Sequence, residues 1–175
     1  MTDLERDVRA AIRDIPDFPK PGVLFKDITP MLAEPALFSR VIDWYAEPYR
    51  KERVDRVVGM ESRGFIFGGA LAKALNAGFA PARKKGKLPF DTVGVDYALE
   101  YGAAVLELHV DAIKPGDRVL ICDDLLATGG TAKATADLVR KLGGQVVAST
   151  FVIELGFLGG RDRLAGYDVH SLITY

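Results

Sequence analysis

The run from Val119 to Thr131 combines residue types that suit the binding of a sugar phosphate. It opens with apolar residues that predict a buried strand, at whose end lie the adjacent carboxylates Asp123 and Asp124. The small residues that follow are Ala127, Thr128, Gly129, Gly130 and Thr131, before a helical pattern from Ala132 onward. Glycines allow backbone N–H groups at a helix start to approach an anion closely, and threonine hydroxyls add donors. We therefore predict a phosphate cradle in this turn.

The two carboxylates suit a different part of the same ligand, because they would repel a phosphate. Carboxylates accept hydrogen bonds from a vicinal diol and help to hold hydrated Mg2+. A plainer interpretation is that Asp123 and Asp124 only cap the helix and form a solvated turn. Other phosphate loops fit less well, because the chain has no G-x-x-x-x-G-K-[ST] run and no G-x-G-x-x-G after a strand.

This run resembles the phosphoribosyl pyrophosphate signature of the type I phosphoribosyltransferases, and from Asp123 to Thr131 it is similar to the version in their adenine-using members. Such enzymes transfer ribose 5-phosphate from phosphoribosyl pyrophosphate to a base. The resemblance implies that Asp123 and Asp124 hold the ribose hydroxyls and that residues 127–131 wrap the 5′-phosphate. It also implies Mg2+ as cofactor, held mainly through substrate and water with no direct protein ligands.

Two further segments resemble the parts of that family that bind pyrophosphate. Glu61, Ser62 and Arg63 form a turn between a predicted strand over 56–60 and a predicted helix over about 65–75. An arginine can bind a pair of pyrophosphate oxygens bidentately. The basic loop 83–89 contributes Arg83, Lys84 and Lys87 as a cation cluster for the leaving group. Taken without the resemblance, these segments are a surface turn and a solvated charge run.

The proline-rich stretch 17–30 is interpreted as an ordered loop with a short extended piece. It resembles the hood segment of the adenine-using enzymes, which implies that Leu24, Phe25 and Lys26 bind adenine, with Phe25 stacking on the ring. The family often has arginine where this chain has Lys26, and lysine lacks the planar fork of arginine. A lone phenylalanine such as Phe25 would otherwise be taken for a core residue.

The segments 93–97 and 103–110 predict two strands of a hairpin or long flap. The run from Tyr97 to Gly102 resembles the mobile catalytic loop of the family. That resemblance implies that Glu100 is the catalytic residue near the purine imidazole and that Tyr101 packs over the substrate. Spacing alone does not distinguish Glu100 from other surface carboxylates.

Composition narrows the class of protein. A chain of 175 residues, 49% hydrophobic and 27% charged, favours one globular domain. The net charge of −1 shows no basic field for nucleic acid. The single cysteine, Cys122, excludes an internal disulfide and suits a reducing cytoplasm. We expect no membrane span and no signal peptide, because no apolar run is long enough and the start of the chain is polar.

Strands and helices alternate through the middle of the chain, which predicts a three-layer α/β domain with a mostly parallel sheet. Before it, Thr2 and Glu5 form a capping box for a helix expected to continue to Ile15, where Pro16 stops it. The resemblance adds a type I phosphoribosyltransferase fold with a five-stranded core. We expect a single domain over 1–175, with an N-terminal helix and hood segment at 1–34 and a basic loop and flexible flap at 84–102.

The expected reaction is adenine plus phosphoribosyl pyrophosphate giving AMP and pyrophosphate, a purine salvage reaction, in a homodimeric cytoplasmic enzyme. Two alternatives stay open. One is a phosphoribosyltransferase for hypoxanthine, xanthine or orotate. The sequence of the hood segment argues against this alternative. The other is a non-catalytic sensor of phosphoribosyl pyrophosphate that controls transcription. Such a sensor would need a nucleic-acid-binding element, and the sequence shows no helix-turn-helix extension.

Overall fold

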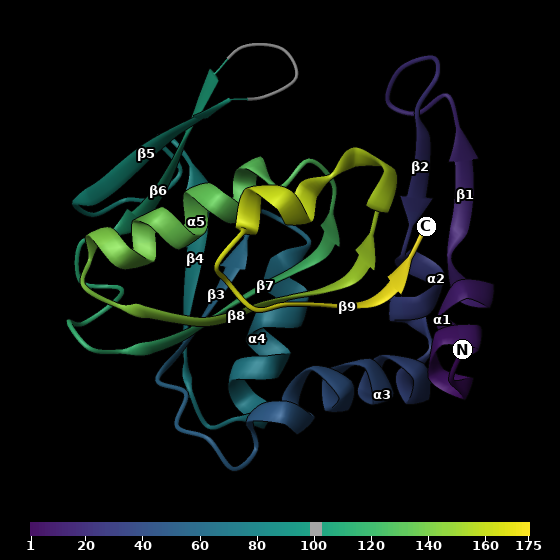
Figure 1. Cartoon of the computed structure of the whole chain (residues 1–175), viewed down its shortest axis with the longest axis horizontal. Helices are drawn as coiled ribbons and strands as arrows, with labels where there is room; N and C mark the ends of the chain where they lie inside the picture. Colours follow the sequence, from purple (N-terminus) through teal and green to yellow (C-terminus); the bar gives the residue numbers. More distant parts are fainter. Residues whose placement is uncertain (99–102) are drawn as a thin grey trace. The chain divides into compact units, whose positions relative to one another are not determined.

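The computed structural model describes residues 1–98 and 103–175, and the chain forms two compact units, Met1–Trp44 and Tyr45–Tyr175. The elements of the first unit are α1 (Asp3–Ala11), β1 (Arg13–Pro16), β2 (Leu24–Asp27), α2 (Thr29–Ala33) and most of α3 (Pro35–Ala46). The second unit begins with the end of α3 and η1 (Glu47–Tyr49) and contains the main sheet. Figure 1 shows the elements in chain order.

The first unit confirms the capping box and corrects the predicted extent of the first helix. The Thr2 side chain accepts a hydrogen bond from the Glu5 backbone, as expected. The helix ends at Ala11, however, and Arg13–Pro16 forms β1, which pairs antiparallel with β2. Opposite charges face each other across this pair, with Asp14 beside Lys26. Cross-strand pairing of this kind outweighs a local helical periodicity.

The sheet of the second unit has the strand order β5-β6-β4-β3-β7-β8-β9. Its strands are β3 (Arg56–Met60), β4 (Gly78–Lys84), β5 (Thr92–Ala98), β6 (Ala103–His109), β7 (Arg118–Leu126), β8 (Gln145–Glu154) and β9 (Val169–Thr174). The five strands from β4 to β9 in this order run parallel. The β5–β6 hairpin adds to the β4 edge in antiparallel orientation. The expected mostly parallel sheet with a five-stranded core is therefore confirmed, and so is the hairpin.

Two helices cover opposite faces of this sheet, α4 (Gly64–Ala74) on one side and α5 (Gly130–Lys141) on the other (Figure 1). The connections explain why. The chain moves through α4 from β3 to β4 in one direction along the sheet, and through α5 from β7 to β8 in the opposite direction. Since such crossovers are right-handed, the two helices must lie on different faces. The neighbours β3 and β7 therefore form a topological switch point, where ligands bind in open α/β sheets.

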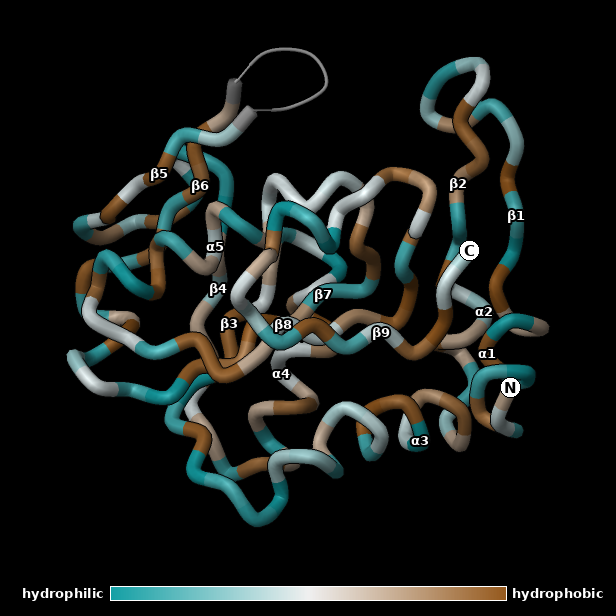
Figure 2. The backbone as a smooth tube through the Cα atoms, viewed as in Figure 1, coloured by the Kyte–Doolittle hydropathy of each residue, from teal (hydrophilic) through white to brown (hydrophobic). Residues whose placement is uncertain are grey.

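The core lies where the parallel strands meet these helices, and hydrophobic stretches recur along these strands (Figure 2). Residues Val119 to Cys122 of β7 are fully buried. The strand is longer than the sequence suggested, because Asp123 still pairs with Phe151 and Leu126 with Glu154 of β8. The acidic pair therefore lies within β7 and not beyond its end. Helix α5 also begins at Gly130, slightly earlier than expected.

Candidate active site

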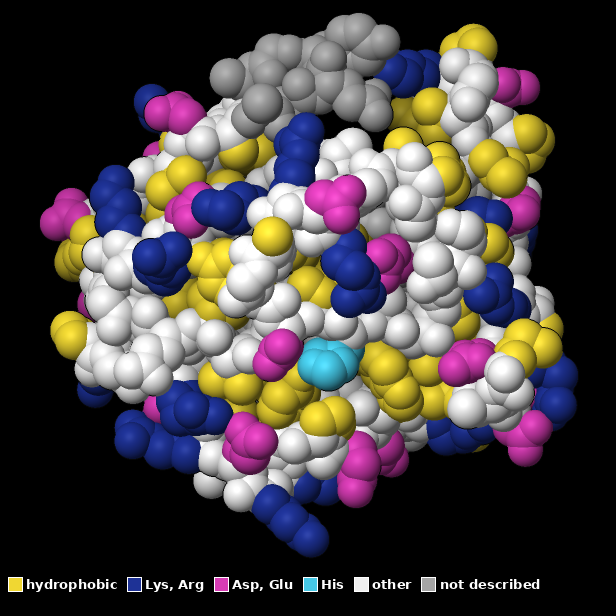
Figure 3. Space-filling model, in the orientation of Figure 1, with side chains coloured by type: hydrophobic (Ala, Val, Ile, Leu, Met, Phe, Trp, Pro, Cys, Tyr) yellow, Lys and Arg dark blue, Asp and Glu magenta, His cyan; other side chains and the backbone are white. Residues whose placement is uncertain are grey.

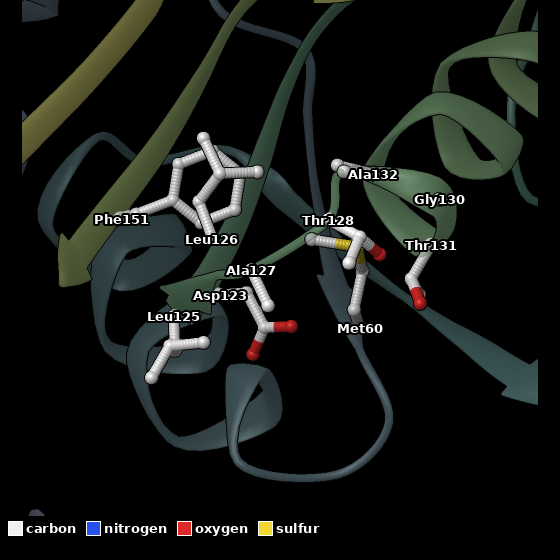
Figure 4. Close-up of a pocket in the computed structure, with 11 residues that line it drawn as sticks. Met60, Asp123, Leu125, Leu126, Ala127, Thr128, Gly130, Thr131, Ala132 and Phe151 are labelled. Carbon is white, nitrogen blue, oxygen red and sulfur yellow. The ribbon is translucent and has the colours of Figure 1, made fainter. Parts of the chain in front are cut away.

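The turn between β7 and α5 forms a small cavity of about 90 Å³ at the switch point. Its lining comprises Met60, Asp123, Leu125, Leu126, Ala127, Thr128, Gly129, Gly130, Thr131, Ala132 and Phe151. Figure 4 shows Asp123 from β7, Thr128 from the turn and Thr131 from the first turn of α5 around this one space. The cavity far exceeds the room that a single water needs, so a phosphate-sized group fits. The structure thus brings all five residues predicted for the phosphate cradle to one cavity.

The backbone of the turn suits an anion. Gly129 has φ +78°, a left-handed conformation that favours glycine. It is the last residue before α5, and its carbonyl oxygen accepts the Lys133 N–H at 2.9 Å. A helix start of this kind presents backbone N–H groups and the positive end of the helix dipole to an anion.

The two adjacent carboxylates occupy different environments. The side chain of Asp123 is half-buried and lines the cavity, and its Oδ1 accepts the backbone N–H of Asp124 at 2.9 Å. The side chain of Asp124 is only 4% exposed, and its Oδ2 lies 2.9 Å from Nε of Arg63. This contact is an ion pair without hydrogen-bond geometry, because Oδ2 has no hydrogen-bond partner among the described residues. The predicted pyrophosphate residue Arg63 therefore lies beside the predicted ribose residue Asp124.

Burial and mutual repulsion make this stretch electrostatically unfavourable when both acids are ionised. Burial raises the pKa of Asp123 well above its usual range, and the neighbouring Asp124 raises it further. Burial also raises the pKa of Asp124, although the Arg63 guanidinium opposes that shift. The pKa of the adjacent Cys122 thiol is raised by burial and by both carboxylates. The site is thus prepared for donors, such as hydroxyl groups or a hydrated cation, that would stabilise the charged carboxylates.

Two residues that the sequence does not single out lie against Asp123. The hydroxyl of Tyr45, a buried residue at the end of α3, donates to the backbone carbonyl of Asp123 at 2.9 Å. Gly64, the first residue of α4, lies so close that a Cβ atom there would be 2.7 Å from Asp123 Oδ1. Neither Tyr45 nor Gly64 carries a signal in the sequence that could have marked it for this position.

The turn after β3 and the basic loop after β4 are joined by Glu61. Its Oε2 accepts the Lys84 backbone N–H at 3.0 Å and lies 3.3 Å from Nε of Arg83. Burial raises the pKa of Glu61, but these two hydrogen bonds and the positive charges of Arg83 and Lys87 together outweigh that effect, and the net pKa shift is downward. Glu61 therefore stays ionised at neutral pH. The Glu61–Ser62 peptide bond is cis, and Ser62 is exposed.

The basic loop presents its cations to solvent from a fixed backbone. Arg83 donates from a terminal guanidinium nitrogen to the Lys87 carbonyl at 3.0 Å. The Gly86 N–H donates to the buried Glu107 carboxylate at 2.9 Å. The side chains of Lys84 and Lys87 remain exposed. The structure thus brings Glu61, Arg83, Lys84 and Lys87 together as one group.

The predicted adenine-binding residues lie on β2 in the first unit. Leu24 is 51% exposed, and Phe25 packs edge-on against Phe18 with ring centroids 5.1 Å apart. Lys26 is buried, and its Nζ lies 2.7 Å from Oδ1 of Asp14. The ammonium group therefore holds β2 to β1 through an ion pair. The predicted catalytic residue Glu100 and flap residue Tyr101 lie outside the described residues.

Comparison with known proteins bears on what such a site does. A sequence profile of the phosphoribosyl transferase domain matches residues 28–171. An adenine phosphoribosyltransferase of Myxococcus xanthus is 56% identical over 174 residues, which span 99% of this chain and 95% of that protein. The chain belongs to the adenine phosphoribosyltransferase family.

Solved structures of adenine phosphoribosyltransferases agree. The enzyme of Rhodothermus marinus has a TM-score of 0.95 and 53% identity, with 98% of each chain covered. The enzyme of Saccharomyces cerevisiae, solved with adenine and an imino-altritol bisphosphate, has a TM-score of 0.93 and 39% identity. That match covers 99% of this chain and all of the yeast chain. The predicted type I phosphoribosyltransferase fold is thereby confirmed.

Within 1–98 and 103–175, no three or more His, Cys, Asp or Glu side chains are grouped so that they could hold a metal ion. In the same ranges, no helix has the length and apolar character needed to cross a bilayer. On the face shown in Figure 3, acidic and basic side chains are interspersed.

Proposed function

We propose that this protein transfers ribose 5-phosphate from phosphoribosyl pyrophosphate to adenine, releasing AMP and pyrophosphate. The observation that carries the proposal is the cavity after β7, where a glycine turn and the Asp123 carboxylate adjoin one space at the switch point. Full-length similarity to adenine phosphoribosyltransferases supports adenine as the base. The yeast relative, which was solved in complex with adenine and a bisphosphate, supports it further.

The loop after β7 holds the ribose 5-phosphate end of the substrate. Backbone N–H groups and hydroxyls of residues 127–131 bind the 5′-phosphate. Asp123 accepts hydrogen bonds from the ribose hydroxyls, and donors there stabilise the ionised form that burial disfavours. Asp124 contributes to the ribose site and fixes Arg63 through their ion pair. Such fixed groups lower the barrier by holding the anomeric carbon in line with the base.

The loops after β3 and β4 receive the pyrophosphate. Ser62 and Arg63 in the turn, and the cations Arg83, Lys84 and Lys87 beside it, would stabilise the negative charge that builds up on the leaving group. Glu61 belongs to this group as a support. A carboxylate repels pyrophosphate, whereas its contacts with Arg83 and the Lys84 backbone hold the basic loop in place.

The donor set fits a Mg2+ ion that is held mainly by substrate oxygens and water. Asp123 offers a half-buried carboxylate at the cavity, and no protein cage surrounds it among the described residues. When bound, Mg2+ would neutralise part of the pyrophosphate charge. The residues around it would orient the substrate and exclude water.

Recognition of adenine is assigned to the first unit, with Phe25 stacking on the ring and Leu24 adding apolar surface. Because the ammonium of Lys26 is paired with Asp14, we assign its contact with the base to the backbone. Glu100 is proposed to exchange a proton with the purine nitrogen that does not react, and Tyr101 to cover the substrate. Replacing Glu100 by Gln should then slow turnover without loss of phosphoribosyl pyrophosphate binding.

We further propose one catalytic domain over 1–175, with the hood segment at 1–34 and the basic loop and flap at 84–102. By analogy with the family, the protein would act as a cytoplasmic homodimer in purine salvage. It would use small-molecule substrates only, with no nucleic-acid or membrane partner.

The test is a turnover assay with Mg2+ and phosphoribosyl pyrophosphate, in which adenine, hypoxanthine, guanine, xanthine and orotate are offered separately. AMP from adenine, with little or no nucleotide from the other bases, is the expected result. Another nucleotide as main product would overturn the assignment of the hood. Saturable binding of phosphoribosyl pyrophosphate without any product would favour a sensor.

A further inference from the structure

The phosphate turn is in direct backbone contact with a second glycine turn that comes from elsewhere in the chain. After β8, the chain forms η2 (Gly156–Leu158) and η3 (Gly160–Leu164) before it returns through β9. A Cβ atom on Gly160 would overlap the Ala127 carbonyl oxygen and come within 3.0 Å of the Gly129 nitrogen. A Cβ atom on Gly129 would in turn overlap the Gly160 carbonyl oxygen. Both positions therefore exclude any side chain.

The atoms in this contact cannot move aside without a shift of the main chain, because all of them are backbone atoms. A crowded side chain, in contrast, could rotate away. Gly160 is also buried, so an added methyl group there would have no open space to occupy. A single added methyl group would have to shift either the phosphate turn or the segment Gly159–Leu164, which we call the supporting segment.

The supporting segment is anchored at several points. Nε of Arg161 lies 3.0 Å from Oε1 of Glu154, and a terminal nitrogen donates to the Val169 carbonyl at 2.8 Å. The Arg161 hydrogen bonds lower the pKa of Glu154, so the pair is charged at neutral pH. Leu164 is buried in a cluster of core residues that includes Leu126. Side-chain hydrogen bonds to β8 and β9 thus hold the segment against the phosphate turn.

We propose that Gly160 is a positioning residue for the 5′-phosphate. The supporting segment sets the position of the Ala127–Gly129 backbone, and with it the direction of the N–H groups that bind the phosphate. This inference rests on the proposed function and deepens it. It predicts that crowding at Gly160 weakens binding of every ligand with a 5′-phosphate ester and leaves pyrophosphate binding intact, because the cations for pyrophosphate lie on other loops.

The experiment compares the wild-type protein with Gly160→Ala and with Gly156→Ala as a matched control. The control adds the same methyl group just before the supporting segment, where the nearest atoms are the Thr174 Cγ2 at 3.1 Å and the Tyr175 carbonyl oxygen at 3.4 Å, and not the phosphate turn. Affinities for AMP and for magnesium pyrophosphate are measured by calorimetry, and the KM for phosphoribosyl pyrophosphate by initial rates. In Gly160→Ala we expect AMP affinity to fall about tenfold, with a similar rise in that KM. Pyrophosphate affinity should stay at the wild-type value, and the control should match the wild type throughout.

Unchanged AMP affinity in folded Gly160→Ala would overturn the proposal, and so would an equal loss of AMP and pyrophosphate affinity. If Gly160→Ala does not fold, the variant Arg161→Lys tests the proposal instead. Lysine keeps the charge but loses the bidentate contact with Glu154. This variant should show the same selective loss at smaller size. If the wild-type protein made no AMP, while Gly160→Ala still lost AMP affinity selectively, the proposed function would be refuted and the positioning role would stand.

Discussion

The loop after β7 and the loops after β3 and β4 follow neighbouring parallel strands, yet they present different chemical groups. The first offers backbone N–H groups, hydroxyls and a half-buried carboxylate, and a second backbone turn fixes its position. The others offer exposed or half-buried cations, with Glu61 and Glu107 holding the backbone beneath them. A phosphate ester that stays bound throughout the reaction suits rigid geometry. A pyrophosphate that must leave suits charges that water can screen.

The carboxylate of Asp123 is the part of the first loop whose loss should cost most. Asp123→Asn keeps the oxygen that accepts the Asp124 N–H but removes the charge that orders the ribose hydroxyls. We expect turnover to fall about 100-fold or more, because fixed groups that stabilise a developing charge have effects of this size. Steady-state rates with saturating adenine would measure it. Turnover within a factor of two of the wild type would show that Asp123 is only a cap.

The Arg63–Asp124 ion pair links the two regions, so breaking it should affect stability as well as binding. In Arg63→Met the nearly buried carboxylate of Asp124 loses its cation, and the free energy of unfolding should fall by about 1–3 kcal/mol. The loss should be greater at pH 7 than at pH 4, because Arg63 lowers the pKa of Asp124. Chemical denaturation would measure both values.

The double variant Arg63→Met, Asp124→Asn is the control for this prediction. It removes the carboxylate that the single variant leaves unpaired, so it should recover most of the lost stability. If the single and double variants were equally unstable, the ion pair would have no part in the effect.

The smallest effect expected is on stability: the Asp123 carboxylate should make the free energy of unfolding depend on pH. Its pKa is raised in the folded protein, above about 3.9 in the unfolded chain, so the folded state binds protons more tightly. The free energy of unfolding therefore falls as the pH rises from about 4 toward the raised pKa. Asp123→Asn removes this penalty and should raise the melting temperature more at pH 8 than at pH 4. A variant that is less stable at pH 8 than the wild type would contradict the raised pKa.

The sequence could predict the parts of the site that local chemistry defines. Residues 127–131 lie around one cavity because a strand, a glycine turn and a helix follow each other within a few residues. The alternation of apolar and helical segments predicted a mostly parallel sheet, and the family resemblance predicted its five-stranded core. The first helix was predicted too long, because the pairing of Asp14 with Lys26 depends on a strand ten residues further on.

The residues that contact the site from distant parts of the chain could not be predicted from local sequence. Tyr45 reaches Asp123 across 78 residues, and Gly160 meets Gly129 only after the chain has passed through α5 and β8. The sequence around Gly159 and Gly160 has no neighbouring acidic pair and no helical run, so it carries no local signal of phosphate binding. The positioning role proposed for Gly160 follows only from packing, because its backbone lies against the backbone of the phosphate turn.

The central claim is that the two regions hold opposite ends of one substrate, and a crossed binding measurement tests it most directly. Gly129→Ala and the double variant Lys84→Ala, Lys87→Ala would each be titrated with AMP and with magnesium pyrophosphate. We predict that Gly129→Ala loses affinity for AMP and keeps that for pyrophosphate, and that the lysine variant does the reverse. If both variants lost affinity for the same ligand, the division between the regions would be wrong.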